Sequence, residues 1–175
     1  MRRRPTADER TVPGDGQESV WDYPRPPAVD PVDEHVVVTL AGTVVADVRG
    51  AVRVLETSHP PTYYLPRDGF ADGSLRPVPG RRTFCEFKGV ATYFDLVAQR
   101  EDGEVFREAA AWTYEQPTDG FEALAGMIAM YPQSADEITV DGEPVRAVQG
   151  DFYGGWVTSR VVGPFKGEVV GSEWW

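Results

Sequence analysis

Short runs of β-branched residues, broken by turn residues, dominate the chain after residue 34 and predict strands. The valine-rich runs 35–40 and 43–48 are joined by Ala41-Gly42, a combination typical of a β-hairpin. Further strands are predicted at 62–65, 105–112, 127–131, 137–140 and 144–148, and Asp141-Gly142 is the tightest turn signal. We therefore predict a mainly β fold of antiparallel sheets.

One or two short helices are predicted between these strands. Val48, Ala51, Val52 and Leu55 recur at helical spacing, so a short helix fits within 50–58. It must end before His59, because Pro60 forces the residue before it out of the α region. The run 119–126 begins with a capping residue and continues with helix formers, which indicates a second helix.

Prolines and glycines shape the segment that follows. Pro60-Pro61 and Pro66 bracket 62–65, so we expect this strand at the edge of a sheet. The run 69–82 holds three glycines and two prolines and is predicted to be a loop long enough to act as a lid.

The run 83–98 predicts a hairpin that turns at Lys88-Gly89. With that turn, Cys85 pairs with Thr92, and both lie on one face with Thr83, Phe87, Val90, Phe94 and Leu96. The other face carries Phe84, Glu86, Ala91, Tyr93 and Asp95, with Lys88 at its rim. We expect the first face to be core and the second to be a polar site or a solvated surface.

The chain divides into three parts by composition. Residues 1–19 are rich in charged residues, proline and glycine and are predicted to be a disordered tail. Residues 20–33 form a strap of prolines and aromatics, with Trp21 and Tyr23 as anchors on the domain surface. Residues 34–175 make a single β-rich domain, whose glycine-aromatic runs 151–156 and 163–167 are expected to cover a core or line a cleft.

Overall composition narrows the class of protein. The 175 residues carry a net charge of −11, which argues against nucleic acid as the main partner because phosphate binding needs clustered Lys and Arg. The chain has one cysteine and no apolar run of eighteen residues. We therefore expect a soluble cytoplasmic protein with no internal disulfide and no membrane partner. Its oligomeric state is not predicted.

The candidate chemistry gathers around Lys88, one of only two lysines beside fifteen arginines. Lysine supplies a compact ammonium whose pKa falls on burial, whereas guanidinium stays protonated. With Glu86, Glu56 and the phenol of Tyr93, Lys88 can bind a polar metabolite or transfer protons. The alternative is a solvated residue beside a turn, or a surface ion pair of little consequence.

Two other groups of residues offer chemistry. Cys85, His59 and Glu56 are the ingredients of an activated thiol, although Cys85 on an apolar face behaves as a small hydrophobe. An aromatic pocket is the second possibility, with core packing as its alternative; its candidates are Tyr63, Tyr64, Tyr93, Trp112 and Trp156, beside Tyr114 and Tyr153. No His or Asp spacing predicts a metal site, and no cofactor is predicted.

The runs 53–66, 85–93, 110–114, 152–156 and 163–167 together resemble the family of domains of unknown function numbered 427. The resemblance extends in order from about residue 35 to 167. It implies a β-tent fold similar to the Mss4 exchange factor, whose relatives hold zinc through cysteine pairs that are absent here. The family also carries a nucleotidyltransferase-like label. That chemistry needs a Gly-Ser pair followed by an Asp-x-Asp pair, and here Gly73-Ser74 is not followed by one. The ending 171–175 departs from the family pattern.

Three functions follow from these observations. The leading hypothesis is a domain that binds a small polar or aromatic metabolite between the 53–66 run and the 83–94 hairpin. The second is an enzyme that uses the same site, with Lys88 or His59 as its proton-transfer group. The third is a protein-interaction module that uses the proline and aromatic strap.

Overall fold

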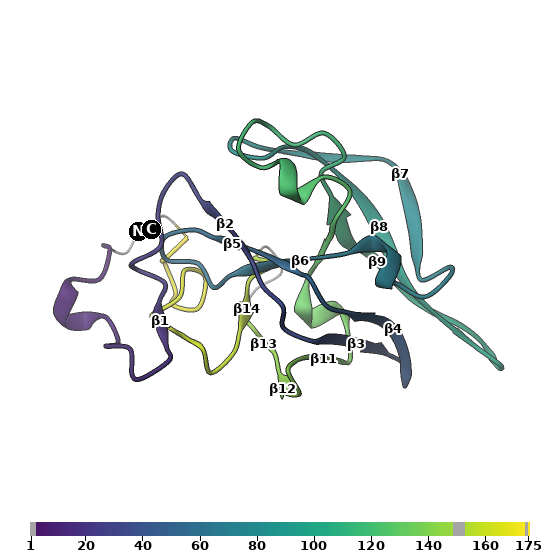
Figure 1. Cartoon of the computed structure of the whole chain (residues 1–175), viewed down its shortest axis with the longest axis horizontal. Coiled ribbons are helices and arrows are strands. Elements are labelled where there is room, and N and C mark those ends of the chain that lie inside the picture. The colour runs from purple at the N-terminus through teal and green to yellow at the C-terminus, as the bar shows by residue number, and fades with distance from the viewer. Residues whose placement is uncertain (1–2, 149–152, 174) are drawn as a thin grey trace.

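Two antiparallel sheets form the framework of the protein in a computed structural model that describes residues 3–148, 153–173 and 175 (Figure 1). The larger sheet has the order β2 (Ala28–Pro31), β5 (Val52–Leu55), β6 (Thr62–Leu65), β10 (Ile128–Met130), β9 (Gly103–Thr113), β8 (Gly89–Arg100) and β7 (Leu75–Cys85). The smaller sheet has the order β12 (Glu143–Pro144), β11 (Glu137–Val140), β3 (Val36–Leu40) and β4 (Thr43–Val48). β1 (Glu18–Ser19) pairs with β15 (Val161–Val162), and β13 (Arg146–Ala147) pairs with β14 (Trp156–Val157).

The prediction of a mainly β fold is confirmed, but the predicted helices are not. The segment 50–58 forms strand β5, because Val52 and Val54 alternate with Arg53 and pair with strands on both sides. The segment 119–126 contains only the single turn η3 (Glu122–Leu124). The other helical elements are also single 3-10 turns, η1 (Ala7–Glu9), η2 (Arg67–Gly69) and η4 (Pro132–Ser134), and no α-helix occurs among the described residues.

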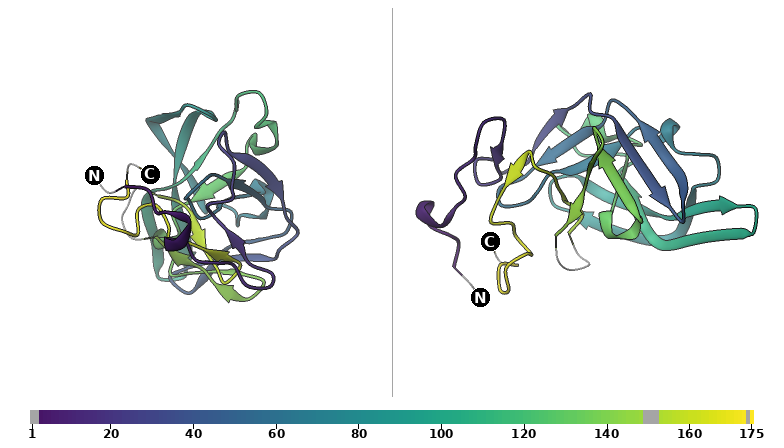
Figure 2. Two further views of the ribbon diagram at one scale, coloured as in Figure 1. Left: turned by 90° about the vertical axis from the view of Figure 1, so that its left-hand side faces the viewer. Right: turned by 90° about the horizontal axis from the view of Figure 1, so that it is seen from below.

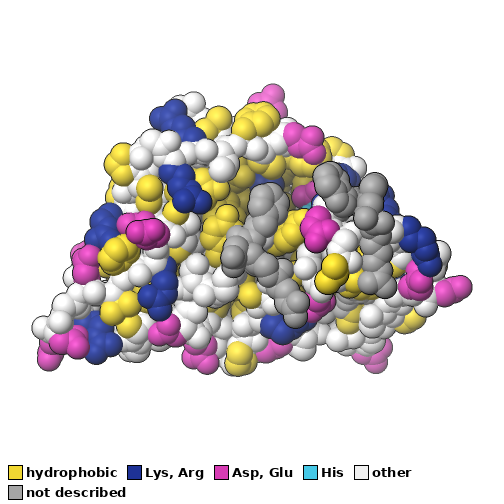
Figure 3. All heavy atoms as spheres, turned by 180° about the vertical axis from the view of Figure 1, so that it is seen from behind, with side chains coloured by type: hydrophobic (Ala, Val, Ile, Leu, Met, Phe, Trp, Pro, Cys, Tyr) yellow, Lys and Arg dark blue, Asp and Glu magenta, His cyan; other side chains and the backbone are white. Residues whose placement is uncertain are grey.

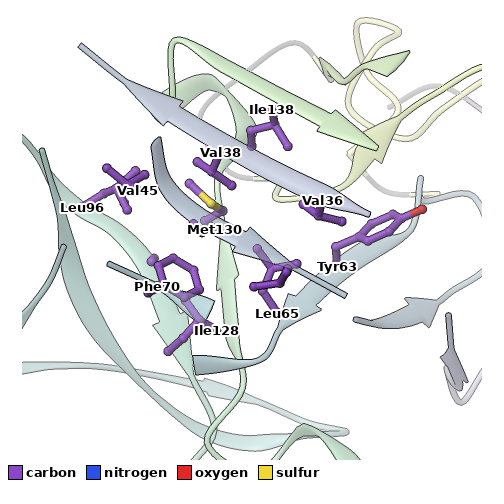
Figure 4. Close-up of a cluster of buried hydrophobic side chains, with 14 of the residues drawn as sticks. Val36, Val38, Val45, Tyr63, Leu65, Phe70, Leu96, Ile128, Met130 and Ile138 are labelled. Atoms are coloured by element: carbon purple, nitrogen blue, oxygen red, sulfur yellow. The ribbon is translucent and has the colours of Figure 1, made fainter. Parts of the chain in front are cut away.

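The main core fills the space between the two sheets (Figure 4). Val36 and Val38 of β3 point into it from the smaller sheet, and Leu65, Ile128 and Met130 point into it from the larger one. All five side chains are fully buried. Burying an aliphatic side chain of this size contributes about 1.5–3 kcal/mol to folding. This core fixes the larger sheet in place.

A second hydrophobic cluster covers the opposite face of the larger sheet. Successive residues of a strand point to opposite faces, so Tyr63 joins the core between the sheets while Tyr64 joins the second cluster. Trp112, Phe121 and Leu124 belong to the same cluster, the last two from the loop that follows β9. The larger sheet is therefore covered on both faces.

The hairpin of β7 and β8 has a different register from the predicted one. Cys85 pairs with Gly89 and Phe84 with Val90, so the turn holds residues 86–88 instead of Lys88-Gly89. Next to the turn the sum of the paired residue numbers falls from the predicted 177 to 174, and an odd change moves the side chains of residues 83–85 to the other face. Cys85 therefore lies on the side of Tyr93, while Phe84 and Val90 are 75% and 48% exposed.

Two other strand predictions need correction. The segment 62–65 forms β6 as predicted, but this strand lies inside the sheet, between β5 and β10. The segment 69–82, predicted as a loop, contributes most of β7, which is the edge strand of the larger sheet. Pro77 and Pro79 are accommodated there because an edge strand leaves backbone N–H groups unpaired on one side.

A bulge bends β9 before it reaches the second cluster. Phe94 pairs with Ala111 but Leu96 pairs with Arg107, so three residues of β9 lie opposite Asp95 alone. The carboxylate of Asp95 accepts a hydrogen bond of 2.9 Å from the backbone N–H of Ala109, which has a φ of 46°. Bulges increase the local twist of a strand. This one sets the direction in which residues 110–114 continue.

From residue 3 onwards the N-terminal segment has a defined path. Residues 3–24 cross the C-terminal segment, and both ends of the chain lie at the same end of the molecule (Figure 2). Trp21 and Tyr23 of this segment are buried. The indole N–H of Trp21 donates to the Pro164 carbonyl at 2.9 Å, and its ring lies 5.5 Å from that of Trp175.

A buried ion network fastens this N-terminal segment to the larger sheet. The guanidinium of Arg53, whose side chain is 2% exposed, donates to Asp30 and to both carboxylate oxygens of Glu18. Arg160 bridges Glu18 at 2.8 Å and Glu34 at 2.7 Å. Burial alone would raise the pKa of Glu18, but hydrogen bonds from Tyr23 and Arg53 hold it below its ordinary value.

Candidate functional site

A pocket of about 340 Å³ lies on the face of the larger sheet that carries the second cluster. Figure 3 shows the hollowed face of the molecule, with hydrophobic side chains within the hollow and charged side chains around it. The pocket is lined by Thr62, Tyr64, Thr83, Phe84, Lys88, Tyr93, Trp112, Tyr114, Tyr131 and Gly154. Ligand pockets commonly combine aromatic walls of this kind with a few polar groups.

Strand register places the large rings of the pocket in one row across the sheet. Tyr64 pairs with Ala129, Ala129 with Trp112, and Trp112 with Tyr93. Paired residues share a face, so these side chains all point to the pocket side. The methyl group of Ala129 is the smallest in the row and leaves room for the rings of Tyr64 and Trp112 on either side.

The rings of this row contact further aromatics from neighbouring segments. The Trp112 ring lies 4.7 Å from that of Tyr131 at 50° and 6.5 Å from that of Tyr93. The ring of Tyr64 lies 6.3 Å from that of Tyr114. These tilted contacts are typical of aromatic pairs and hold the walls of the pocket in fixed orientations.

A glycine closes the pocket against Trp112. A Cβ atom on Gly154 would lie 2.3 Å from the outer edge of the Trp112 ring, and one on Gly155 would lie 2.6 Å from the Pro60 carbonyl oxygen. Only glycine allows the backbone to approach both groups this closely. The glycine-aromatic run predicted at 151–156 thus lines the cleft at Gly154, while its first two residues lie outside the described residues.

The phenols inside the pocket are protonated near neutral pH. Burial raises the pKa of Tyr64, and burial together with the neighbouring Tyr64 hydroxyl and Cys85 thiol raises that of Tyr114. Burial and the Tyr93 hydroxyl raise the pKa of Tyr131 to about 12. A protonated phenol both donates and accepts a hydrogen bond. The walls can therefore bond to polar ligand atoms as well as stack on a ring.

Lys88 lies at the edge of this aromatic surface, with its Nζ atom 5.9 Å from the centre of the Tyr114 ring. The two carboxylates expected to pair with it instead contact Arg25. Its guanidinium lies 3.4 Å from Glu56 and 3.5 Å from Glu86. The structure therefore places Lys88 in the pocket lining and Glu56 and Glu86 beside Arg25.

His59 occupies a separate cluster next to the pocket. Its ring lies 5.6 Å from that of Tyr153, and its Nδ1 atom is 3.0 Å from the Thr57 carbonyl oxygen. Burial lowers its pKa, while Glu56 acts in the opposite direction. His59 is not among the residues that line the pocket.

The predicted thiol arrangement is not formed. Cys85 packs partly buried in the second cluster, close to Tyr64 and Tyr114. In the part of the chain that the structure describes, no hydrogen bond joins its thiol to His59. That part also contains no group of three His, Cys, Asp or Glu side chains placed to hold a metal ion.

Three of the predicted pocket aromatics, Tyr63, Tyr153 and Trp156, are not among the lining residues. Tyr63 and Trp156 stack at 4.8 Å and 11° in the core between the sheets, where they are 2% and 0% exposed. The residues of the predicted set that line the pocket are Tyr64, Tyr93, Trp112, Tyr114 and Lys88. Phe84 lines the pocket and was placed on the predicted site face, whereas Thr83 was placed on the core face. Thr62 and Tyr131 were not predicted, and for Tyr131 only the aromatic end of a predicted strand could have indicated it.

The comparisons with known proteins agree with the residues that suggested a resemblance. A family described as a domain of unknown function, DUF427, matches residues 28–141. No curated protein matches the chain. The matched range contains the strands that form the row of rings, but it ends before Gly154. The described residues contain no helix long and apolar enough to cross a bilayer.

Proposed function

The chain belongs to the DUF427 family, whose description leaves the activity open, and we propose that it binds a small polar or aromatic metabolite in the aromatic pocket. The observation that carries this proposal is the convergence of two separate runs on one hollow. Thr62 and Tyr64 come from the 53–66 run, and Thr83, Lys88 and Tyr93 come from the 83–94 hairpin.

The size and lining of the pocket support a small ligand. Pockets for small molecules measure roughly 300–1,000 Å³ and are mainly apolar with a few polar groups. The volume of about 340 Å³ is at the small end of that range, which suits a ligand of one or two rings. A larger hollow of about 790 Å³ lies at the tips of β3–β4 and β8–β9, but it has no aromatic lining.

The two alternative functions have less support. The strap is used within the chain itself, since the indole of Trp21 bonds to Pro164 and the hydroxyl of Tyr23 bonds to Glu18 at 2.7 Å. A protein-interaction module that used the strap would have to release these two side chains from their contacts within the chain. A catalytic role would fall to Lys88, because His59 lies outside the pocket lining.

Native mass spectrometry of the purified protein, followed by a thermal-shift screen with a metabolite library, tests the proposal. A ligand present at 100 times its dissociation constant adds about 2.7 kcal/mol of stability, or roughly 5–11 °C for a chain of this size. Every hit is then repeated with Tyr131→Ala, which removes one wall of the pocket. The matched control is Phe106→Ala, which removes an aromatic ring that is 42% exposed and distant from the lining.

A hit that is lost in Tyr131→Ala and kept in Phe106→Ala places the ligand in the pocket. Hits that respond equally to both substitutions would contradict the proposed site. A library without a hit, together with no copurifying mass, would contradict the proposed function as a whole.

A further inference from the structure

The charges at the mouth of the pocket indicate what kind of molecule it takes. Acidic residues outnumber basic ones by 28 to 17 in this chain, yet no Asp or Glu lines the pocket. The neighbouring carboxylates form ion pairs with arginines. Glu56 and Glu86 pair with Arg25, and Glu115 pairs with Arg67 at 3.0 Å. The pocket is therefore a locally non-acidic region on an acidic protein.

Two cations stand over rings of the same pocket, Lys88 from within its lining and Arg81 from beside it. The Nζ atom of Lys88 lies 5.9 Å from the Tyr114 ring centre, and the guanidinium of Arg81 lies 4.9 Å from that of Tyr93. Neither forms an ion pair with a carboxylate among residues 3–148, 153–173 and 175. Nine of the described arginines have carboxylate partners, and Lys88 and Arg81 belong to the cations that have none. Such a cation can bind a ligand anion without first giving up a protein partner.

The polar groups deeper in the pocket also favour an anion. The hydroxyls of Tyr64, Tyr114 and Tyr131 stay protonated and can donate hydrogen bonds. The hydroxyl groups of Thr83 and Tyr93 bond to each other at 2.9 Å at the rim. With no carboxylate in the lining, a cationic ligand would meet cations and find no counter-ion.

The flat walls restrict the shape of the ligand. Trp112 and Tyr131, with ring centres 4.7 Å apart, present ring faces and edges to a pocket of about 340 Å³. Planar rings gain both area burial and oriented ring contacts against such walls, whereas a puckered ring gains only the area. We infer that the pocket binds a planar, aromatic or conjugated monoanion of one or two rings, whose carboxylate or equivalent group lies against Lys88 and Arg81.

This inference rests on the proposed function and deepens it, and a matched set of probes separates the two. We would measure dissociation constants by isothermal titration calorimetry for 2-naphthoate, 2-naphthamide, 2-naphthylmethylamine and decahydro-2-naphthoate. The first three share the flat ring and differ in charge, and the fourth keeps the charge and loses planarity. We expect 2-naphthoate to bind about tenfold tighter than each of the others, since a hydrogen bond to a charged group is worth roughly 1.5–3 kcal/mol.

Lys88→Met tests the role of the cation, and Lys166→Met is its matched control. Lys166 is also followed by glycine, and its Nζ atom also lies 5.9 Å from a tyrosine ring, that of Tyr153, but it does not line the pocket. Lys88→Met should weaken 2-naphthoate about tenfold and leave 2-naphthamide within about twofold. Lys88→Arg should keep most of the preference for the anion, and Lys166→Met all of it.

Several results would overturn the inference. Equal affinity for 2-naphthoate and 2-naphthamide, or no measurable binding of 2-naphthoate, would remove the preference for an anion. Equal affinity for the decahydro compound would remove planarity. If 2-naphthamide binds as tightly and is lost in Tyr131→Ala, the pocket remains a binding site and only the charge assignment fails.

Discussion

The fastening of the N-terminal segment by Arg53 leads to a quantitative prediction, with Arg53→Met as the perturbation. Methionine keeps most of the aliphatic length of the side chain and removes its charge. The change leaves Asp30 and Glu18 without the guanidinium that bonds to both. Removing one partner of a buried ion pair costs about 3–5 kcal/mol, mainly because a charge remains buried without compensation.

The surroundings of the two carboxylates place the expected cost at the lower end of that range. The side chains of Glu18 and Asp30 are 29% and 36% exposed, so water can solvate them in part. Glu18 also keeps its 2.8 Å bridge to Arg160. We expect Arg53→Met to lower the free energy of unfolding by about 3 kcal/mol at pH 7. With a urea m value of about 2 kcal/mol/M, the midpoint falls by about 1.5 M.

The pH dependence distinguishes lost charge from lost packing. The pKa of Glu18 is lower in the folded protein than its ordinary value, so its contribution to stability is full above about pH 4.3. That contribution is lost as the pH falls through the lowered folded pKa. The difference between wild type and Arg53→Met should therefore shrink between pH 7 and pH 3.5.

Urea unfolding followed by circular dichroism at both pH values provides the measurement. Arg49→Met is the control, because Arg49 is exposed and, within the described residues, its side chain bonds only to the Asp33 carbonyl at 2.9 Å. Its effect should stay below about 0.5 kcal/mol. If the cost of Arg53→Met is the same at pH 7 and pH 3.5, the loss comes from packing and the reasoning about the ion network fails.

Three further substitutions follow from the geometry. Gly154→Ala should lower stability by about 1–3 kcal/mol and weaken pocket ligands in titrations, because its Cβ meets the Trp112 ring; unchanged affinity would contradict the close approach. Ala41→Asn should raise the free energy of unfolding measured with urea by roughly 0.5 kcal/mol, since φ is 51° at Ala41 and asparagine tolerates this region. A lower free energy of unfolding would contradict the turn geometry. The pKa of His59 is lowered in the folded protein, so stability declines as the pH falls below about 6.5. His59→Gln should therefore flatten the urea-derived stability profile between pH 7.5 and 5.5. An unchanged slope would refute this.

Local sequence patterns were sufficient for most strands but not for their partners. The hairpin of β3 and β4 was predicted because both β-branched runs and the Ala41-Gly42 turn lie within fourteen consecutive residues. The position of β6 inside the sheet could not be predicted, because its second partner, β10, lies about sixty residues further along the chain. The helix predicted at 50–58 failed for the same reason, since pairing with β2 and β6 overrode a short helical spacing.

The site was predicted in part because one register error reversed a face. Lys88-Gly89 looked like a two-residue turn, but Gly89, with a φ of 95°, is the first residue of β8 and pairs with Cys85. Tyr93 was nevertheless placed on the site face, because β8 itself was read in the correct phase. Tyr131 and Gly154 come from distant segments, so no local pattern could place them beside Trp112.

The pairing of β1 with β15 has a consequence for the order of events during synthesis. Glu18 pairs with Val161, so this contact closes over about 140 residues and must wait until Val161 has emerged from the ribosome. The sheets, whose contacts are nearer in sequence, can form first. Until then the N-terminal residues must stay extended without aggregating. Their composition, rich in charged residues, proline and glycine, keeps them solvated during that time. A segment with the composition of a disordered tail can therefore be the last piece of an ordered structure.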